Sequence, residues 1–217
     1  MNRIAFAALG TVLAIAACSK DKVKDAQAPT KLVGIQSTLS VQRLWQASIG
    51  GGEPVLRLGL GLGHDADHVY AAGHGGEVAA FDIKTGRQLW RIRTRLKLAG
   101  GTGVGAGLVV LGSGEGEVLA LKAADGSLLW QVKVAGEILS APAVSEKIVV
   151  VRTVDGRLHG LASGDGKELW REEQQIPRLT LRGAASPVIV GDVVYCGFDN
   201  GKVLALSLLD GAKLWEA

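Results

Sequence analysis

A short motif that ends in tryptophan occurs four times in the chain, and this repetition constrains the fold more than any other feature of the sequence. The copies align without a gap and occupy residues 76–90, 116–130, 156–170 and 201–215. Apolar residues alternate with others in segments such as "EVLAL" and "KVLAL", which is the period of a pleated β-strand. A Thr-Gly or Asp-Gly pair follows and supplies the positive φ angle that a tight hairpin turn requires. Each copy therefore predicts a strand, a turn and the start of a second strand.

A second apolar hairpin precedes the motif, as in "APAVSEKIVVVRTVDG", so the repeating unit contains four short strands. Pro142 and Pro187 take the same place in two units, fourteen residues before the glycine that opens the motif. Because proline has no N–H to donate, we expect each to stand at the start of an edge strand. The motifs recur every 40 or 45 residues, which is the length of a propeller blade.

The fixed position of the tryptophans distinguishes between the folds that such units can build. Glycine turns and two-residue alternation exclude a helical solenoid, and a β-sandwich gives no reason for a tryptophan at one position of every unit. Neighbouring propeller blades do give a reason, because they bury facing sheets. We therefore predict an all-β fold, a β-propeller of four-stranded antiparallel blades, with about four blades in this chain. Trp45 lacks a preceding hairpin, so we expect it in the last strand of a blade whose other strands lie elsewhere in the chain.

The N-terminus has the features of a bacterial secretion signal. Residues 1–17 contain Arg3 and then an uncharged apolar run that is too short to cross a bilayer comfortably. The run ends in the sequence Ile15-Ala16-Ala17-Cys18, which resembles a lipobox and so implies a lipid on Cys18, and Ser19 after it points to the outer membrane. An ordinary signal peptide with an accidental cysteine is the alternative. Residues 18–40 are polar and without pattern, so we expect a flexible tether, and we assign residues 41–217 to the partial propeller.

The motif and the lipobox together give a family resemblance. The segment "VLALKAADGSLLW" is similar to the PQQ-like repeat, and the whole chain resembles the BamB family, the β-propeller lipoproteins of the outer-membrane β-barrel assembly machinery (the BAM complex). The resemblance implies a non-catalytic scaffold without a cofactor, held by lipid at the periplasmic face of the outer membrane. It also implies that the partners are BamA and the BAM complex, with unfolded outer membrane proteins as further candidates.

The number of motifs departs from the pattern of that family. Its propellers have eight blades, whereas this sequence stops two residues after its fourth motif tryptophan. An open ring leaves sheet edges and a blade face exposed, which invites aggregation. We therefore expect a fragment of a longer chain, with half of an eight-bladed ring; completion of the ring by a partner is the alternative.

One connection between units is longer than its counterpart. Twelve residues lead from Trp130 to Pro142, but seventeen lead from Trp170 to Pro187, so the segment "REEQQIPRLTLRGAAS" contains five additional residues. The connection after Trp45 has the same excess. Both longer connections lead into the next predicted blade.

The connection after Trp170 carries apolar and cationic side chains. Leu179 and Leu181 alternate and so share one side of an extended segment, with Arg178 and Arg182 beside them. Apolar anchors next to a guanidinium are typical of interface hot spots, although leucines packed on the blade below would give the same pattern. The family resemblance implies that Leu179, Leu181 and Arg182 bind a periplasmic POTRA domain of BamA.

Two other functions are alternatives to this scaffold. A quinoprotein dehydrogenase with pyrroloquinoline quinone and Ca²⁺ would share the repeat, and a lipid-anchored recognition propeller would share the anchor but bind another partner. Such enzymes often carry adjacent cysteines, whereas lipidation of Cys18 leaves only Cys196, which we expect to be a small buried residue. We therefore expect no enzymatic activity. The net charge of only +3 gives no strong attraction to nucleic acid, and we expect none as a partner.

Three further segments mimic functional sites. "HDADH" at residues 64–68, together with His74, has metal-ligating side chains, but its place in the repeat predicts a solvated turn. "GGTGVGAG" at residues 100–107 precedes a strand instead of a helix, so we expect a hairpin and no dinucleotide site. "RQLWRIRTRLKL" is expected to place basic residues on one face of a strand, either solvated or in contact with an acidic partner or a lipid headgroup. These residues are Arg91, Arg93, Arg95 and Lys97.

Overall fold

The chain divides into two units, residues 1–42 and 43–217. The computed structural model describes residues 30, 32–34, 36, 38–50, 60–177 and 185–217. The described residues of the first unit form no helix or strand, and Cys18 lies with the expected signal peptide outside the described residues. Over the part of the chain that the structure describes, no helix is long and apolar enough to cross a membrane.

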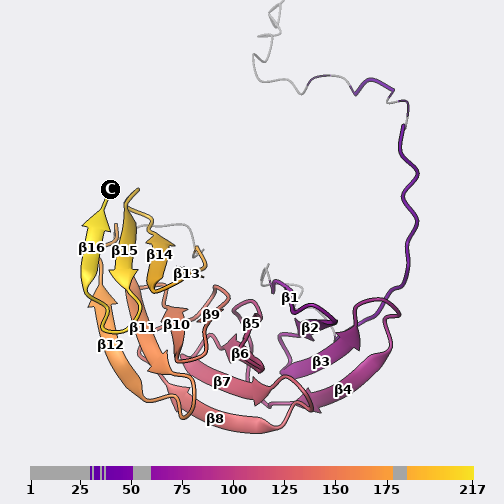
Figure 1. Cartoon of the computed structure of the whole chain (residues 1–217). Helices are drawn as coiled ribbons and strands as arrows, with labels where there is room; N and C mark the ends of the chain where they lie inside the picture. The colour runs from indigo at the N-terminus through magenta and orange to yellow at the C-terminus, as the bar shows by residue number, and fades with distance from the viewer. Residues whose placement is uncertain (1–29, 31, 35, 37, 51–59, 178–184) are drawn as a thin grey trace, which may run out of the picture. The chain divides into compact units, whose positions relative to one another are not determined.

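The second unit contains four sheets, each with four antiparallel strands in chain order (Figure 1). We refer to these sheets as blades one to four. Blade one contains β1 (Gly63–His64), β2 (His68–Ala72), β3 (Glu77–Asp82) and β4 (Gln88–Arg93); blade two contains β5 (Gly103–Gly105), β6 (Leu108–Gly112), β7 (Glu117–Lys122) and β8 (Leu128–Lys133). Blade three contains β9 (Ala143–Val144), β10 (Ile148–Arg152), β11 (Arg157–Ala162) and β12 (Glu168–Glu173); blade four contains β13 (Val188–Val190), β14 (Val193–Gly197), β15 (Val203–Ser207) and β16 (Lys213–Glu216). The predicted all-β fold with four-stranded blades is confirmed.

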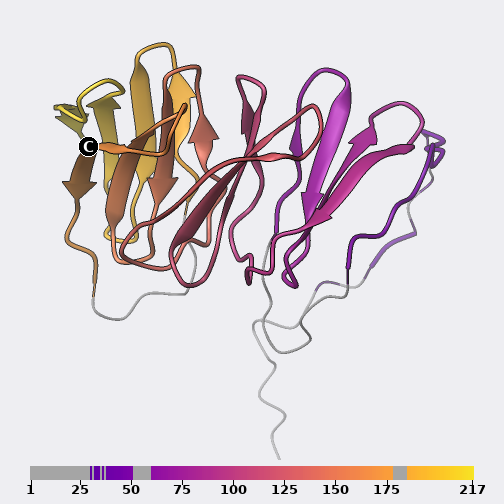
Figure 2. The same ribbon diagram turned by 90° about the horizontal axis from the view of Figure 1, so that it is seen from below.

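The first strands of successive blades lie next to one another, on the inner side of the arc that the blades form (Figure 1). Figure 2 shows the blades side by side in chain order. A Cβ atom on Gly103 of β5 would collide with the backbone of Pro142, so glycine allows the inner strands this close approach. Pro142 and Pro187 directly precede β9 and β13, which are edge strands as predicted. The segment "GGTGVGAG" forms part of the β5–β6 hairpin, also as predicted.

Hydrophobic clusters fill the seams between neighbouring blades rather than the interior of a single sheet. The cluster between blades one and two joins Tyr70 and Val78 to Val109 and Leu111. Two further clusters join blade two to blade three and blade three to blade four. Each blade therefore depends on its neighbour for the burial of its apolar faces, as expected for stacked repeats.

The tryptophans of blades one to three close these seams. Each is 9% exposed or less, and each indole N–H donates to a backbone carbonyl in a hairpin of the next blade. The pairs are Trp90 with Ala123 (2.9 Å), Trp130 with Ser163 (2.7 Å) and Trp170 with Leu208 (2.8 Å). A glycine with positive φ lies against each of these indoles, because a side chain there would occupy the space of the ring. The Asp-Gly turns of the motif therefore serve both the hairpin and the seam.

Trp45 takes the same position on blade one. Its indole N–H donates to the carbonyl oxygen of Ile83 at 2.9 Å, and its ring lies against Gly86. This confirms that Trp45 is the equivalent of a motif tryptophan. Residues 43–49 nevertheless form no strand, because no neighbouring strand of the described chain pairs with them.

Trp215 differs from the other motif tryptophans. Its side chain is 46% exposed, because it lies on a face of blade four that no further described blade covers. This exposure agrees with the expectation that a partial ring leaves one blade face uncovered.

The basic segment of blade one also departs from its prediction. β4 ends at Arg93, which pairs with Glu77 at the start of β3, so the ladder has no partner for the residues that follow. Arg91 lies within the strand, whereas Arg95 has a φ angle of 64° and lies with Lys97 beyond it. The four basic side chains are all exposed, but they do not share one strand.

Candidate partner-binding site

The residues predicted to bind a partner, Leu179, Leu181 and Arg182, fall in the segment 178–184, outside the described residues. The structure does describe the chain on both sides of this segment. We call residues 174–177 and 185–187, with the side chains that bind them, the connection base. Its geometry shows how the longer connection between blades three and four is attached to the propeller.

The N-terminal side of the connection base belongs to the seam between blades three and four. The Gln174 N–H donates to the carbonyl oxygen of Gly156 at 3.0 Å, and Ile176 packs against the hydrophobic cluster of this seam. The Asn200 side-chain amide of blade four donates to the carbonyl oxygen of Gln175 at 2.8 Å. Both neighbouring blades therefore hold the chain as far as Ile176.

The C-terminal side is held in a similar way. The Ala141 N–H donates to the Ser186 hydroxyl oxygen at 3.2 Å, and Pro187 is buried directly before β13. One guanidinium nitrogen of Arg152 donates to the carbonyl oxygen of Ala185 at 3.4 Å. Contacts from blade three therefore hold the described residues on both sides of the segment 178–184.

Arg152 links the connection base to blade four, and none of the sequence motifs predicted this role. Its side chain is 1% exposed and donates to the Asp199 carboxylate at 3.1 Å. The guanidinium lies 4.9 Å from the centre of the Phe198 ring, which is a cation–π distance. Arginine is almost never fully buried without such partners. In the sequence, this role could have been suspected from a charged residue that directly follows the strand sequence "IVVV".

An open polar groove of about 440 Å³ lies beside the connection base. Its charged groups are already paired, since Lys202 and Lys213 both contact Glu216, and Glu173 contacts Arg157. The groove therefore offers amide groups and balanced charges, which suit a polar protein surface better than a charged small molecule. The lining residues are Glu173, Gln174, Gln175, Asn200, Lys202, Lys213 and Glu216.

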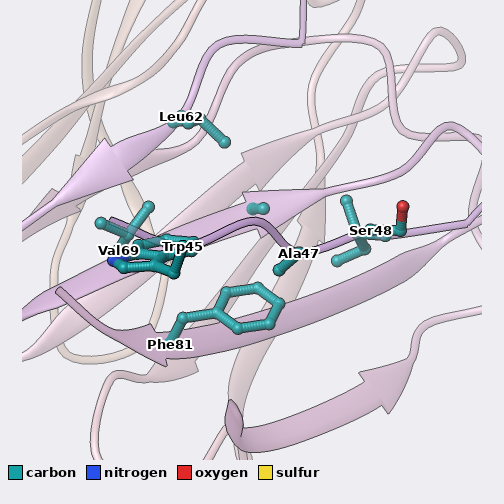
Figure 3. A pocket seen from close by; sticks show the side chains of 8 residues that line it. Trp45, Ala47, Ser48, Leu62, Val69 and Phe81 are labelled. Carbon is teal, nitrogen blue, oxygen red and sulfur yellow. The ribbon is translucent and has the colours of Figure 1, made fainter. Parts of the chain in front are cut away.

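A separate apolar pocket of about 120 Å³ lies on blade one, where the segment around Trp45 covers the sheet. Figure 3 shows Phe81, Val69 and Leu62 around the indole of Trp45. The rings of Trp45 and Phe81 are stacked with 6.3 Å between their centres. The lining residues are Trp45, Ala47, Ser48, Ile49, Leu62, Val69, Ala71 and Phe81.

This pocket does not fit the cofactor of a quinoprotein enzyme. Pyrroloquinoline quinone carries several carboxylates, but no charged side chain lines the pocket. The volume of about 120 Å³ is also below the range of roughly 300–1,000 Å³ that is common for ligand sites. Among the described residues, no group of three or more histidine, cysteine or acidic side chains could hold a metal ion.

The histidine-rich segment of blade one forms a turn, as predicted. Asp65 accepts hydrogen bonds from the N–H groups of Asp67 (2.9 Å) and His68 (2.8 Å) and from the Tyr70 hydroxyl (2.8 Å). Burial by itself would raise the pKa of Asp65, but these hydrogen bonds outweigh it and lower the pKa from 3.8 to about 2. The Asp65 carboxylate therefore holds the turn together, and His74 contacts a backbone carbonyl elsewhere.

Cys196 is the small buried residue that the sequence predicts. Its side chain is 3% exposed and packs in the seam between blades three and four. Burial raises the pKa of its thiol to about 11, so very little thiolate forms near neutral pH. A nucleophilic role for this cysteine is not supported.

Comparison with known proteins adds to these observations. The family model described as outer membrane protein assembly factor BamB matches residues 32–99 and 74–217 of the chain. The protein of that name from Alkalilimnicola ehrlichii is 57% identical over 100% of this chain and 55% of its own length. Its counterpart from Pseudomonas aeruginosa is 48% identical over 97% of this chain and 55% of its own length. The chain therefore spans about half the length of the curated relatives it matches.

Solved structures give the same result for the fold. The crystal structure of BamB from Moraxella catarrhalis superposes with a TM-score of 0.69 at 28% identity, over 74% of this chain and 49% of that one. The computationally designed Ika4 protein superposes with a TM-score of 0.57 at 19% identity, over 73% of this chain and 99% of that one. The second similarity concerns the fold alone.

Proposed function

The chain belongs to the family of the outer membrane protein assembly factor BamB, and on this premise we propose that it is a non-catalytic scaffold of the outer-membrane β-barrel assembly machinery. In this proposal it binds BamA and aids the folding and insertion of outer membrane proteins. A lipid on Cys18 holds it at the periplasmic face of the outer membrane, and residues 18–40 act as the tether. The assignment of residues 1–17 as a signal peptide belongs to the same proposal.

The connection base is the observation that carries the BamA proposal. The connection between blades three and four has five residues more than the one before it, and contacts from both blades fix its two ends. A rigid scaffold that holds both ends of a loop reduces the entropy that the loop loses on binding. The additional residues include Leu179, Leu181 and Arg182. Arginine is enriched in interface hot spots, and the two leucines would add apolar contact area beside it.

An enzymatic function has less support. The apolar pocket on blade one lacks the charged groups that a quinone cofactor requires, and burial suppresses the ionisation of the Cys196 thiol. The relatives carry the name of an assembly factor. We therefore propose that the chain acts through binding alone.

A double substitution tests the BamA proposal. We expect Leu179→Ala with Arg182→Ala to weaken binding to BamA by about thirtyfold or more, because it removes an apolar anchor and a guanidinium from the same segment. The measurement is titration calorimetry of the full chain with BamA in detergent, and thermal melting of the variant checks that the fold is intact.

The matched control is Leu128→Ala with Lys122→Ala, which removes an exposed leucine and an exposed cation from blade two. We expect this control to bind BamA like the unmodified chain. Unchanged affinity of the double variant at positions 179 and 182 would contradict the proposed site.

A further inference from the structure

A row of basic side chains begins on β4, the outer edge strand of blade one, and continues past the end of that strand (Figure 1). Exposed and partly buried residues alternate from position 91 to position 97, and every exposed residue among them is a cation. Ile92 and Leu96, which lie between the cations, pack against the hydrophobic cluster of the seam between blades one and two. The row therefore presents charge to the solvent without an apolar anchor. We call it the cationic stripe, and its members are Arg91, Arg93, Arg95 and Lys97.

The repeat does not require cations at these positions. The cations that blades two and three carry there are paired with acids of their own blade, Lys133 with Glu117 at 3.3 Å and Arg171 with Glu168 at 3.7 Å. Among the first three blades, only blade one has a cation at all four positions. The equivalent residues are Gln131, Lys133, Ala135 and Glu137 in blade two, and Arg171, Glu173, Gln175 and Pro177 in blade three.

Three members of the stripe have no acidic partner. Arg93, Arg95 and Lys97 form no ion pair within the part of the chain that the structure describes. Glu77 stands opposite Arg93 in the β3–β4 ladder, but its Oε2 atom is buried and has no hydrogen-bond partner there. Exposed cations that no internal acid neutralises attract anionic partners.

The stripe lies beside the segment through which the chain enters the propeller. The Arg91 guanidinium donates to the carbonyl oxygen of Ser48 at 2.8 Å, and Trp45 of the same segment is bound to blade one. A lipid on Cys18 would therefore be joined to the propeller at the blade that carries the stripe. A basic patch is a common second signal beside a lipid anchor, because the two together hold a protein at a membrane more firmly than either alone.

We propose that the cationic stripe binds an anionic phospholipid surface, so that blade one faces the membrane. Charge without an apolar anchor suits lipid headgroups better than a protein partner, because the core of a protein interface is apolar and aromatic. Each arginine or lysine near an anionic surface strengthens binding by about fivefold. The inference rests on the proposed function in one respect, that a lipid on Cys18 places the chain at a membrane.

The test measures co-sedimentation with vesicles that contain phosphatidylglycerol and phosphatidylcholine in equal parts. The protein is the proposed mature chain, residues 18–217, with Cys18→Ala, so that no lipid on the protein contributes. We expect it to bind these vesicles at low salt, to bind vesicles of phosphatidylcholine alone far more weakly, and to dissociate as the salt concentration rises.

The variant Arg93→Gln, Arg95→Asn, Lys97→Gln removes the three unpaired cations. Asparagine is chosen at position 95 because the φ angle there is 64°, which asparagine tolerates. We expect binding to the anionic vesicles to weaken by about a hundredfold, with thermal melting as the check of folding. If this variant does not fold, Arg93→Gln with Lys97→Gln takes its place, and we expect a loss of about twentyfold.

The matched control makes the same change in net charge at exposed lysines of blades two and three, near the ends that carry the Asp-Gly turns. It is Lys122→Gln, Lys147→Gln, Lys167→Gln. We expect this control to bind the anionic vesicles like the unmodified chain. An equal loss from both variants would show that net charge governs the binding and would overturn the stripe. The absence of any binding by the unmodified chain would also overturn it and would favour an acidic protein as the partner.

These outcomes are separate from those of the BamA proposal. If the stripe variant binds vesicles normally while Leu179→Ala with Arg182→Ala loses BamA, the inference is wrong and the proposed function stands. If the stripe variant loses the vesicles while the other variant keeps BamA, the stripe stands and the proposed BamA site is wrong.

Discussion

Single residues decide how closely two blades approach. At the seam between blades two and three, Gly166 has a φ angle of 76°, and a Cβ atom there would lie 2.7 Å from the Trp130 ring. Glycine is needed here for two separate reasons, its positive φ angle and the space that the indole occupies. The Asp-Gly signal in the sequence indicates the first reason, and only the packing of the neighbouring blade reveals the second.

These two reasons can be measured separately. We expect Gly166→Ala to lower the free energy of unfolding by about 2–5 kcal/mol, since it adds a clash with Trp130 to the cost of a positive φ angle. The control is Gly191→Ala, whose φ angle is 58° but whose Cβ atom would meet open space. We expect about 1 kcal/mol for this control. If urea denaturation gave the same loss of unfolding free energy for both variants, the Trp130 indole would not restrict the size of the side chain at position 166.

Among the structural elements, the turn between β1 and β2 depends on one carboxylate. Asp65 accepts hydrogen bonds from two backbone N–H groups and from Tyr70, and its pKa is lowered to about 2 in the folded protein. The folded state therefore favours the ionised form. Its stabilising effect is fully present above the unfolded pKa near 3.8 and disappears as the pH falls toward 2.

We expect Asp65→Asn to be less stable than the unmodified chain by about 1 kcal/mol at pH 7, a value reduced for solvent screening because the carboxylate is 39% exposed. The difference should shrink as the pH falls from 4 to 2, because the aspartate becomes increasingly protonated and therefore neutral, like asparagine. Urea denaturation of both proteins at pH 7 and at pH 2 measures the difference. A gap of the same size at both pH values would contradict the role of the ionised carboxylate.

Local sequence patterns predicted those strands and turns whose formation depends on residues within one hairpin. Alternation, turn glycines and the two prolines predicted the four strands of each blade, because these signals act within a hairpin. The end of β4 at Arg93 was missed, because it depends on where β3 begins. Arg152 was missed because its partner Asp199 lies 47 residues further along the chain, in the next blade. Such a contact leaves no periodic signal.

For the molecule as a whole, the hydrophobic clusters lie between blades, so stability is shared among nearest neighbours. The outer faces of the first and the last blade differ, since Trp45 covers blade one while Trp215 on blade four is exposed.

The resemblance in the sequence led to the correct family, which the comparisons confirm. The proposed partner residues could not be derived from the repeat, because the longer connection is the part that departs from it.

The central claim is that this connection, and not the repeated surface of the blades, binds the partner. The most direct test places a photoreactive amino acid at Leu181 in one variant and at Leu128, an exposed leucine of blade two, in another. Both are irradiated in living cells that produce BamA. The account predicts a covalent adduct with BamA from position 181 and none from position 128. Adducts of equal yield from both positions, or none from position 181, would contradict it.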